Sequence, residues 1–370
     1  MISTFPRNPQ RDDCYDSQSE LSHTEWTNLG EQVEFSWRNT ARNSWRMMAT
    51  SRRRKEGYEM NVLIVGAAGE VGRYLMKDLS RKGHDVTGLD RAPRPHEMDE
   101  SLPFAYLRGD IADAAVTQEA VQGKDIIIHL AWSFSDDVQT IFAEDIKGHI
   151  NLLEAASSFG IRSFIYTSTA TVYGRASSHP VTEDHPCLID EARKPLYALG
   201  KYTAETLCKV YSKERGLPVT IFRFWWAFGE SIGGRHLRDL TSKALKHEPL
   251  EMVRGAGGAF VTMADLGRAI LSAITKPAPP GQIYNVGSLF LAWEEIGTMI
   301  IGLTQSTSAI QRIPPAEWKG PAFLNEVWDL SWDKAKRELD YEPKDSPELM
   351  RAVFSQALKG CIAEVEKNEK

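Results

Sequence analysis

The chain has 370 residues, of which 42% are hydrophobic and 25% charged, a composition typical of a folded soluble protein large enough for two domains. Its formal net charge of −6 is spread along the sequence, without the clustered Lys and Arg that bind nucleic acid or an anionic membrane surface. No apolar stretch is long enough to span a bilayer, and the four cysteines are far apart. We therefore expect a cytoplasmic protein with reduced thiols and with neither a nucleic-acid nor a membrane partner.

Residues 1–59 differ from the rest of the chain, because they show neither helix nor strand periodicity. They lack the apolar segment of a signal peptide and carry too many acidic residues for a transit peptide. Met60 is followed at once by a strand-like run. We expect residues 1–59 to be a disordered extension, or a segment upstream of a natural start at Met60.

From Asn61 onward, short apolar runs alternate with amphipathic stretches. The runs that predict strands are 61–65, 85–89, 104–107, 125–130, 163–167 and 218–222. The stretches that predict helices include 70–82, 114–122, 138–159 and 196–215. Strands that alternate with helices indicate a doubly wound parallel sheet of the Rossmann type, so the predicted fold class is α/β.

The regular alternation of strand and helix patterns ends at about Arg223. After this residue, Gly and Pro become frequent and the expected elements are shorter. We therefore predict a dinucleotide-binding domain over residues 60–223. Residues 224–370 are expected to form mostly a smaller α/β substrate-binding lobe, with some return of the chain to the first domain.

A glycine-rich segment, Gly66-Ala67-Ala68-Gly69-Glu70-Val71-Gly72, stands between the first predicted strand and the first predicted helix. In a dinucleotide site, the first glycine permits a tight turn, the second lets the backbone approach a pyrophosphate, and the third allows close packing of helix on strand. The helix N-terminus adds free N–H groups and partial positive charge. Glycines alone also suit any tight turn, but this placement favours a cofactor site that includes Glu70 and Val71.

Asp90 ends the second predicted strand, where a carboxylate can accept hydrogen bonds from the ribose hydroxyls of NAD. The same carboxylate would repel the extra phosphate of NADP. The plain alternative is an Asp that starts a turn. Arg91 follows directly and could pair with a 2′-phosphate, so NAD is favoured over NADP only modestly.

Tyr197 and Lys201 lie four residues apart at the start of a predicted helix and so share one face of it. A nearby ammonium and an oxidised nicotinamide ring would both favour the phenolate and lower the tyrosine pKa toward the working range. We therefore expect Tyr197 to be an acid/base group. By itself, a Tyr-x-x-x-Lys pair is common on helix surfaces.

The fifth predicted strand runs into a turn rich in hydroxyl groups, Ser168-Thr169-Ala170-Thr171. Ligands of open α/β sheets bind at the carboxyl ends of the strands, so a hydroxyl here could hold the reacting oxygen of a substrate. Thr169 is the first choice and Ser168 the second. The alternative is that these hydroxyls only stabilise the turn.

These motifs together resemble the extended short-chain dehydrogenase/reductases, the NAD-dependent epimerase/dehydratase family. Besides the segments above, the resemblance rests on Gly109-Asp110-Ile111, His129-Leu130-Ala131, Val172-Tyr173-Gly174, Phe260-Val261-Thr262 and Tyr284-Asn285-Val286-Gly287. It implies an enzyme that binds a small-molecule substrate and forms a homodimer through the helices 138–159 and 196–215. It implies that Thr169, Tyr197 and Lys201 are catalytic. It also implies cofactor contacts by Asp110, Ile111, Leu130, Ala131, Trp132, Ser168, Tyr197, Lys201 and Phe224.

The chain departs from the family pattern at three places. Trp226 stands where many nucleotide-sugar enzymes have an Asn, and Gly258-Ala259 stand where an Arg often precedes the later Phe. Two groups suited to a diphosphate are therefore missing. Asp145 replaces an Asn of the family's proton relay.

Three tryptophans offer apolar faces where those polar groups are missing. We expect Trp132, Trp225 and Trp226, with Thr169, to contact a less charged, sugar-like substrate, although each Trp could equally fill the core.

The leading hypothesis is hydride transfer between a nicotinamide cofactor and a secondary alcohol or ketone, either as net redox chemistry or as epimerisation. The alternative is a nucleotide-sugar 4-epimerase of the UDP-glucose 4-epimerase type. A more remote alternative is a non-catalytic regulator that senses the dinucleotide. The nine histidines show no ligand spacing, so we predict no metal site.

Overall fold

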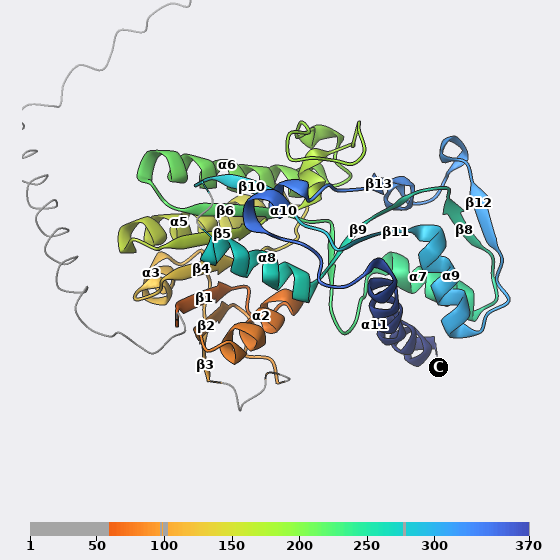
Figure 1. Ribbon diagram of the computed structural model, residues 1–370, viewed down its shortest axis with the longest axis horizontal. Helices are drawn as coiled ribbons and strands as arrows, with labels where there is room; N and C mark the ends of the chain where they lie inside the picture. Colours follow the sequence, from red (N-terminus) through yellow and green to blue (C-terminus); the bar gives the residue numbers. More distant parts are fainter. Residues whose placement is uncertain (1–58, 97, 99–102, 277–278, 370) are drawn as a thin grey trace, which may run out of the picture. The chain divides into compact units, whose positions relative to one another are not determined.

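The computed structural model describes residues 59–96, 98, 103–276 and 279–369, and its largest sheet has seven strands, all parallel (Figure 1). Along the sheet the order is β10-β6-β5-β4-β1-β2-β3. The strands are β1 (Asn61–Val65), β2 (Asp85–Asp90), β3 (Phe104–Arg108), β4 (Ile126–His129), β5 (Ser163–Thr167), β6 (Val219–Arg223) and β10 (Gln282–Asn285). The predicted doubly wound α/β fold is therefore confirmed. Apart from Glu59, the segment 1–59 lies outside the described residues.

The predicted strands 61–65 and 163–167 have the observed bounds of β1 and β5, and the other four differ by one residue at one or both ends. All four residues of β4 are buried, because this strand lies between β1 and β5 and is covered on both faces. Its continuous apolar run is the sequence signature of that position.

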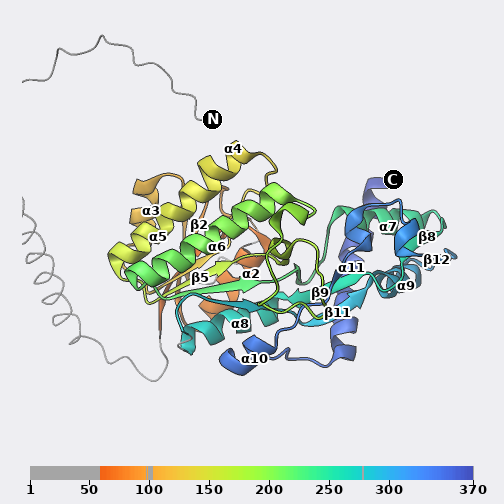
Figure 2. The ribbon, with the colours of Figure 1, turned by 90° about the horizontal axis from the view of Figure 1, so that it is seen from above.

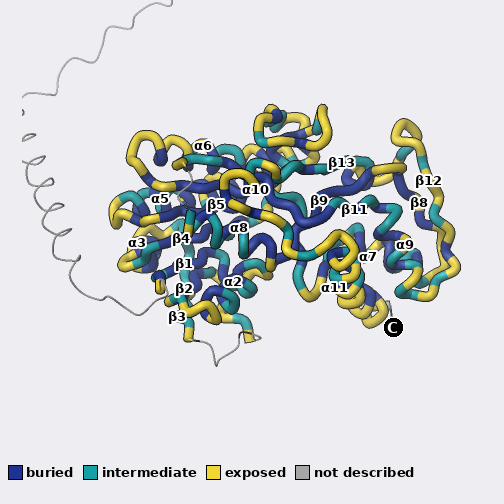
Figure 3. The backbone as a smooth tube through the Cα atoms, in the orientation of Figure 1, coloured by how far each residue is buried: buried dark blue, intermediate teal, exposed yellow. Residues whose placement is uncertain are grey.

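Helices cover both faces of the sheet, as Figure 2 shows from above. One core joins the sheet to α3 (Ala114–Val121), α5 (Lys147–Phe159) and α6 (Pro195–Arg215). A second core on the opposite face joins it to α2 (Glu70–Arg81), α8 (Met263–Thr275) and α10 (Asp333–Leu339). Figure 3 shows the burial concentrated in the strands, with the outer turns of the helices exposed.

The single helix predicted over 138–159 is interrupted. It consists of α4 (Val138–Thr140), a π-helical segment (Ile141–Ile146) and α5. π-helical segments occur frequently at functional sites, because the wider turn changes which side chains face a neighbour. Two consecutive carboxylates of this segment, Glu144 and Asp145, line the pocket at the carboxyl edge of the large sheet.

The remaining elements form a second group around their own core. A smaller sheet has the order β11-β9-β13, with β7 beside β9, and β12 pairs with β8. These elements are β7 (Trp226–Phe228), β8 (Leu250–Val253), β9 (Gly257–Thr262), β11 (Leu289–Ala292), β12 (Ile310–Ile313), β13 (Val327–Trp328), α7 (Arg235–Leu245), α9 (Trp293–Thr304) and α11 (Pro347–Glu369). All the described residues belong to one compact unit, Tyr58–Lys370. The functional division at residue 223 stays a prediction.

A buried ion pair joins the end of β6 to the middle of α6. Arg223 donates to Glu205 through Nε at 2.9 Å and through Nη2 at 2.5 Å, and both side chains are almost completely buried. Two parallel hydrogen bonds fix the guanidinium and carboxylate geometrically. Because α6 also carries Tyr197 and Lys201, this pair anchors their helix to the sheet.

In the part of the chain that the structure describes, no helix combines the length and the apolar character needed to cross a bilayer.

Candidate active site

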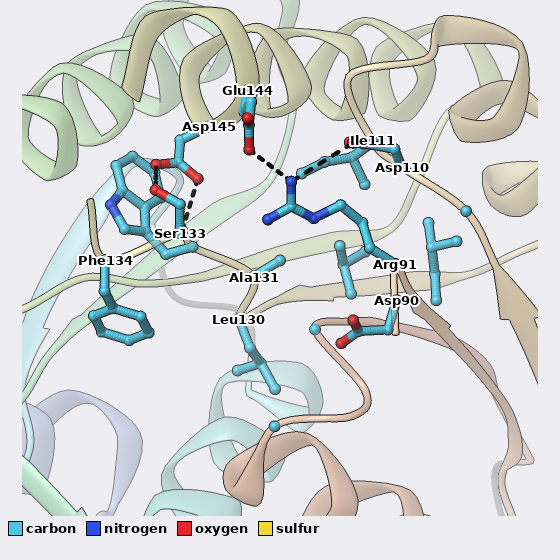
Figure 4. Close-up of a pocket in the computed structure, with 16 residues that line it drawn as sticks. Asp90, Arg91, Asp110, Ile111, Leu130, Ala131, Ser133, Phe134, Glu144 and Asp145 are labelled. Atoms are coloured by element: carbon cyan, nitrogen blue, oxygen red, sulfur yellow. Dashed lines mark hydrogen bonds and ion pairs between the residues drawn. The ribbon is translucent and has the colours of Figure 1, made fainter. Parts of the chain in front are cut away.

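A pocket lies at the carboxyl edge of the large sheet, where β1 and β4 are neighbours and the strand order reverses (Figure 4). Loops that follow these strands leave in different directions, which opens a crevice. Predicted cofactor residues that line it are Gly66, Gly69, Asp90, Arg91, Asp110, Ile111, Leu130, Ala131 and Trp132. Residues that the sequence did not single out as cofactor contacts are Val65, Leu89, Gly109, Ser133, Phe134, Glu144 and Asp145.

The glycine-rich turn has the steric properties that its spacing predicts. Gly66 has φ +90°, and a Cβ there would lie 2.7 Å from the Ala131 backbone nitrogen. A Cβ on Gly72 would lie 2.2 Å from the Gly66 carbonyl oxygen. Gly69 precedes α2 as its N-cap, without a side chain over the free N–H groups. The turn therefore fits the close approach of a pyrophosphate to a helix N-terminus.

Asp90 is tied to this turn. Its Oδ2 accepts a hydrogen bond from the Ala68 N–H at 2.9 Å, and its Oδ1 accepts one from the Ala92 N–H at 3.0 Å. Each carboxylate oxygen keeps a further lone pair that can accept from a hydroxyl. Asp90 therefore both shapes the glycine-rich turn and presents a carboxylate to the pocket.

Arg91 extends from the end of β2 across the pocket, toward the π-helical segment (Figure 4). Its Nη1 lies 2.6 Å from Glu144 Oε2 and 3.8 Å from Asp110 Oδ2. The hydrogen bond with Glu144 raises the pKa of the Arg91 guanidinium. The guanidinium that the sequence offered as a possible partner of a 2′-phosphate thus lies beside two carboxylates.

Tyr197 and Thr169 meet at the other end of this edge. A hydrogen bond with Thr169 acts to lower the Tyr197 pKa, but burial of the phenol is the stronger effect and raises that pKa well above 10. The Tyr197 ring stacks on Phe134 with ring centroids 5.8 Å apart. Thr169 also accepts from the Thr171 N–H at 3.2 Å, so the alternative role in the turn applies to this hydroxyl as well.

The buried ammonium of Lys201 contacts a backbone carbonyl and two aromatic rings. Its Nζ donates to the Thr167 carbonyl at 3.0 Å and lies 4.3 Å from the Trp132 ring centroid and 5.0 Å from that of Tyr166. The ammonium therefore faces a backbone carbonyl and two aromatic rings, and its action on the Tyr197 hydroxyl stays a prediction.

Asp145, in place of the family's Asn, is buried and bound by Ser133. Its Oδ1 accepts the Ser133 N–H at 2.8 Å and its Oδ2 accepts the Ser133 hydroxyl at 2.6 Å. Burial raises the Asp145 pKa, whereas these two hydrogen bonds lower it. Phe134 follows Ser133 with φ +56° and is 66% exposed at the pocket. Ser133 and Phe134 directly follow the predicted HLAW segment, so continuing the loop after β4 would have found them.

Other predicted site residues lie beside the pocket rather than along it. Glu70 is exposed at the first position of α2, and Val71 and Phe224 pack against the sheet core. Ser168 is buried, and its hydroxyl has no hydrogen-bond partner among the described residues. Trp225 stacks on Phe323 at 5.2 Å and Trp226 on Phe260 at 5.6 Å, within the core of the second group of elements.

A glycine-rich turn at the reversal point of a seven-stranded parallel sheet, backed by a strand-end Asp, defines a dinucleotide-binding α/β protein. The model of the NAD dependent epimerase/dehydratase family matches residues 62–287, and the chain belongs to this family. The resemblance in the sequence and the expected class of enzyme are thereby confirmed.

The chain is similar to a UDP-glucose 4-epimerase of Mycolicibacterium smegmatis, with 30% identity over 69% of this chain and 86% of the relative. It is 27% identical to an uncharacterised UDP-glucose epimerase of Bacillus subtilis, over 78% of this chain and 94% of that protein. The structure of a UDP-glucuronic acid 4-epimerase from Bacillus cereus in complex with NAD superposes with a TM-score of 0.66. It is 24% identical and covers 82% of this chain and 100% of that chain. At that identity the superposition shows the shared fold.

Within the described ranges, no group of three or more His, Cys, Asp or Glu side chains is arranged to hold a metal ion.

The burial of Lys201 generates a prediction about stability. Burial lowers its pKa from 10.5 to about 7. Between those pH values the unfolded chain binds a proton that the folded chain lacks, so the unfolding free energy rises with pH across this window by at most about 1.4 kcal/mol per pH unit. Below it, both states bind the proton and the contribution is constant. In Lys201→Met this pH dependence should be lost, as measured by urea unfolding from pH 6 to 9.5.

The matched control is Lys209→Met, which removes an exposed lysine from the same helix. The Lys209 ammonium is in water in both states, so its loss should change stability by a similar amount at every pH. Parallel curves for wild type and Lys201→Met would contradict the prediction.

Proposed function

We propose that the protein binds NAD and catalyses hydride transfer to or from a secondary alcohol or ketone of a sugar-like or other small substrate. One observation carries the proposal: the glycine-rich turn, the Asp90 carboxylate and the Thr169–Tyr197 pair all lie at the carboxyl edge of one parallel sheet. The glycine-rich turn and Asp90 would hold the dinucleotide, which would supply a group able to accept a hydride from the substrate and to return it. Returning it to the opposite face of the substrate gives epimerisation.

The chain's own residues have separate tasks in this proposal. Tyr197 takes or gives the hydroxyl proton of the substrate, and the Thr169 hydroxyl positions the same oxygen. Lys201, held by the Thr167 carbonyl beside Trp132, is placed to contact the nicotinamide ribose. The burial of Tyr197 excludes water from the proton transfer.

NAD is the proposed cofactor, with NADP disfavoured. Asp90, Asp110 and Glu144 place three carboxylates around the pocket, and the Arg91 guanidinium among them is paired. Negative charge at the ribose end of the pocket opposes a 2′-phosphate by like-charge repulsion. The NAD-bound B. cereus structure with the same fold supports this choice.

Tyr197→Phe tests the function directly. The variant removes the hydroxyl that moves the proton, so turnover should fall by about 10²- to 10⁴-fold while NADH still binds. Steady-state rates with a panel of sugars, sugar acids and ketones, and NADH titration by fluorescence, give both readouts. Tyr202→Phe, on the same helix, is the control. Undiminished turnover by Tyr197→Phe would refute the assignment, and retained NADH binding without any turnover by wild type would support the non-catalytic sensor.

A second candidate, a nucleotide-sugar 4-epimerase, is supported by the similar UDP-glucose 4-epimerase of M. smegmatis. The packing around Trp225 opposes it. A Cβ on Gly258 would lie 2.2 Å from a Trp225 ring atom, so the indole occupies the space beside that glycine. A cationic side chain at 258 and this indole cannot coexist in this arrangement. The usual Arg partner of a diphosphate is thus replaced by an aromatic ring.

Titration with UDP separates the two candidates. For the leading proposal we expect no saturable UDP binding in the micromolar range, since the amide and guanidinium partners of a diphosphate are missing. Isothermal titration calorimetry is the measurement, with NADH as the positive control on the same sample. Micromolar UDP binding together with turnover of UDP-glucose would replace the leading proposal with the second.

We also propose a homodimer formed through α5, α6 and the π-helical segment, the two-helix mode that the family resemblance implies. These elements lie side by side on one surface of the molecule (Figure 2). They and the residues just before them carry exposed apolar side chains: Val138, Phe142, Phe159, Leu196, Leu199 and Val210. A clustered apolar surface of this kind marks a protein interface.

Val210→Glu should shift the protein toward monomer. Val210 is 47% exposed on α6, and a carboxylate buried without a partner should weaken association by about tenfold or more. Leu349→Glu is the control, because Leu349 is 51% exposed on α11, outside this surface. Sedimentation velocity over a concentration series gives the oligomeric state. A monomeric wild type, or equal behaviour of the two variants, would exclude the proposed interface.

A further inference from the structure

Arg91 occupies the position from which a cation would reach a 2′-phosphate, directly after Asp90 at the end of β2. Its guanidinium points away from Asp90 and toward the opposite wall of the pocket, as Figure 4 shows. There it meets Glu144 at 2.6 Å, and Asp110 lies at 3.8 Å. The cation is therefore already neutralised by protein carboxylates.

The side chains that line the pocket carry more acidic than basic groups. One guanidinium, that of Arg91, lines it together with the carboxylates of Asp90, Asp110, Glu144 and Asp145. A 2′-phosphate would bring further negative charge into an acidic pocket. To bind that phosphate, Arg91 would have to leave Glu144, whose carboxylate would then be unpaired beside the incoming anion.

Glu144 reaches this position through the π-helical segment. Glu144 and Asp145 are consecutive, yet both line the pocket, Glu144 against Arg91 and Asp145 against Ser133. Asp145 is anchored by two hydrogen bonds, which fix the segment and hence the neighbouring residue. Glu144 is thus held opposite Arg91 by a buried contact next to it in the chain.

We propose that Glu144 is a specificity-determining residue: by engaging Arg91, it keeps that cation from a 2′-phosphate and makes the pocket selective for NAD. The inference rests on the proposed dinucleotide function and deepens it. Two residues then disfavour NADP. The Asp90 carboxylate lies at the expected ribose position, and Glu144 pairs with Arg91, the only arginine that lines the described pocket.

The size of the effect follows from the exposure of the pair. The Arg91 and Glu144 side chains are 55% and 41% exposed, so their mutual attraction is screened by water and is modest. The selectivity then has two contributions: the attraction of Glu144 for the guanidinium, and the repulsion between the Glu144 carboxylate and an incoming phosphate. Glu144→Gln should therefore release Arg91 without large changes elsewhere.

Glu144→Gln tests the inference by cofactor binding. Freed Arg91 can form one charge-assisted contact with the 2′-phosphate, so the Kd for NADPH should fall by about tenfold while the Kd for NADH changes by less than about threefold. The readout is energy transfer from protein tryptophan, including Trp132 in the pocket, to the reduced nicotinamide. Glu119→Gln, which removes an exposed carboxylate of α3, is the control and should change neither Kd.

The double variant Glu144→Gln/Arg91→Ala identifies the cause, because the gain in NADPH affinity should disappear with the guanidinium. A gain that survives in the double variant would overturn the inference, as would an unchanged Kd for NADPH in Glu144→Gln. An equal increase of the Kd values for NADH and NADPH would show that Glu144 only stabilises the shape of the pocket, and this result would also overturn the inference. If wild type binds neither dinucleotide, the proposed function fails as well, whereas NADH binding without the predicted shift removes this inference alone.

Discussion

The reversal of strand order between β1 and β4 is the constraint on which the site depends. Both neighbouring loops leave from this point, and the Gly66 turn packs so closely on the loop after β4 that a Cβ would lie 2.7 Å from the Ala131 nitrogen. Two side-chain contacts connect neighbouring elements to this junction. Asp90 ties β2 to the turn through the Ala68 N–H, and Asp145 ties the π-helical segment to Ser133 after β4. The crevice is thus shaped by a close backbone contact and by two carboxylates that are each bound to backbone N–H groups, which suits a site for an extended cofactor.

Burial sets the protonation of the polar groups at the catalytic end. It raises the pKa of Tyr197, lowers that of Lys201 to about 7 and raises that of Asp145, so burial acts against the charged form of each group. A cation brought to the Tyr197 hydroxyl would act against burial and favour the phenolate. The proposed chemistry therefore couples proton transfer at Tyr197 to the charge of the nicotinamide rather than to Lys201, whose ammonium faces the Thr167 carbonyl.

The parts of the structure that follow from local patterns were predictable, and those that depend on distant contacts were not. β1 and β5 follow from buried apolar runs, and the glycine-rich turn from the steric needs of Gly66 and Gly72. Glu144 has no local signal, because its contact with Arg91 spans 53 residues and depends on a π-helical turn inside a predicted helix. The contact of the Lys201 ammonium with the Thr167 carbonyl has no local signal either, because helical spacing gives the face of the helix but not the group that the ammonium meets.

Two neighbouring tryptophans of the second group of elements, Trp225 and Trp226, each lie against a glycine. Each tryptophan is accommodated by a glycine: a Cβ on Gly258 would lie 2.2 Å from a Trp225 ring atom, and one on Gly234 would lie 2.7 Å from a Trp226 ring atom. Trp225 stacks on Phe323 and Trp226 on Phe260, so aromatic packing joins these elements into one core and fixes the position of the loop that follows β6.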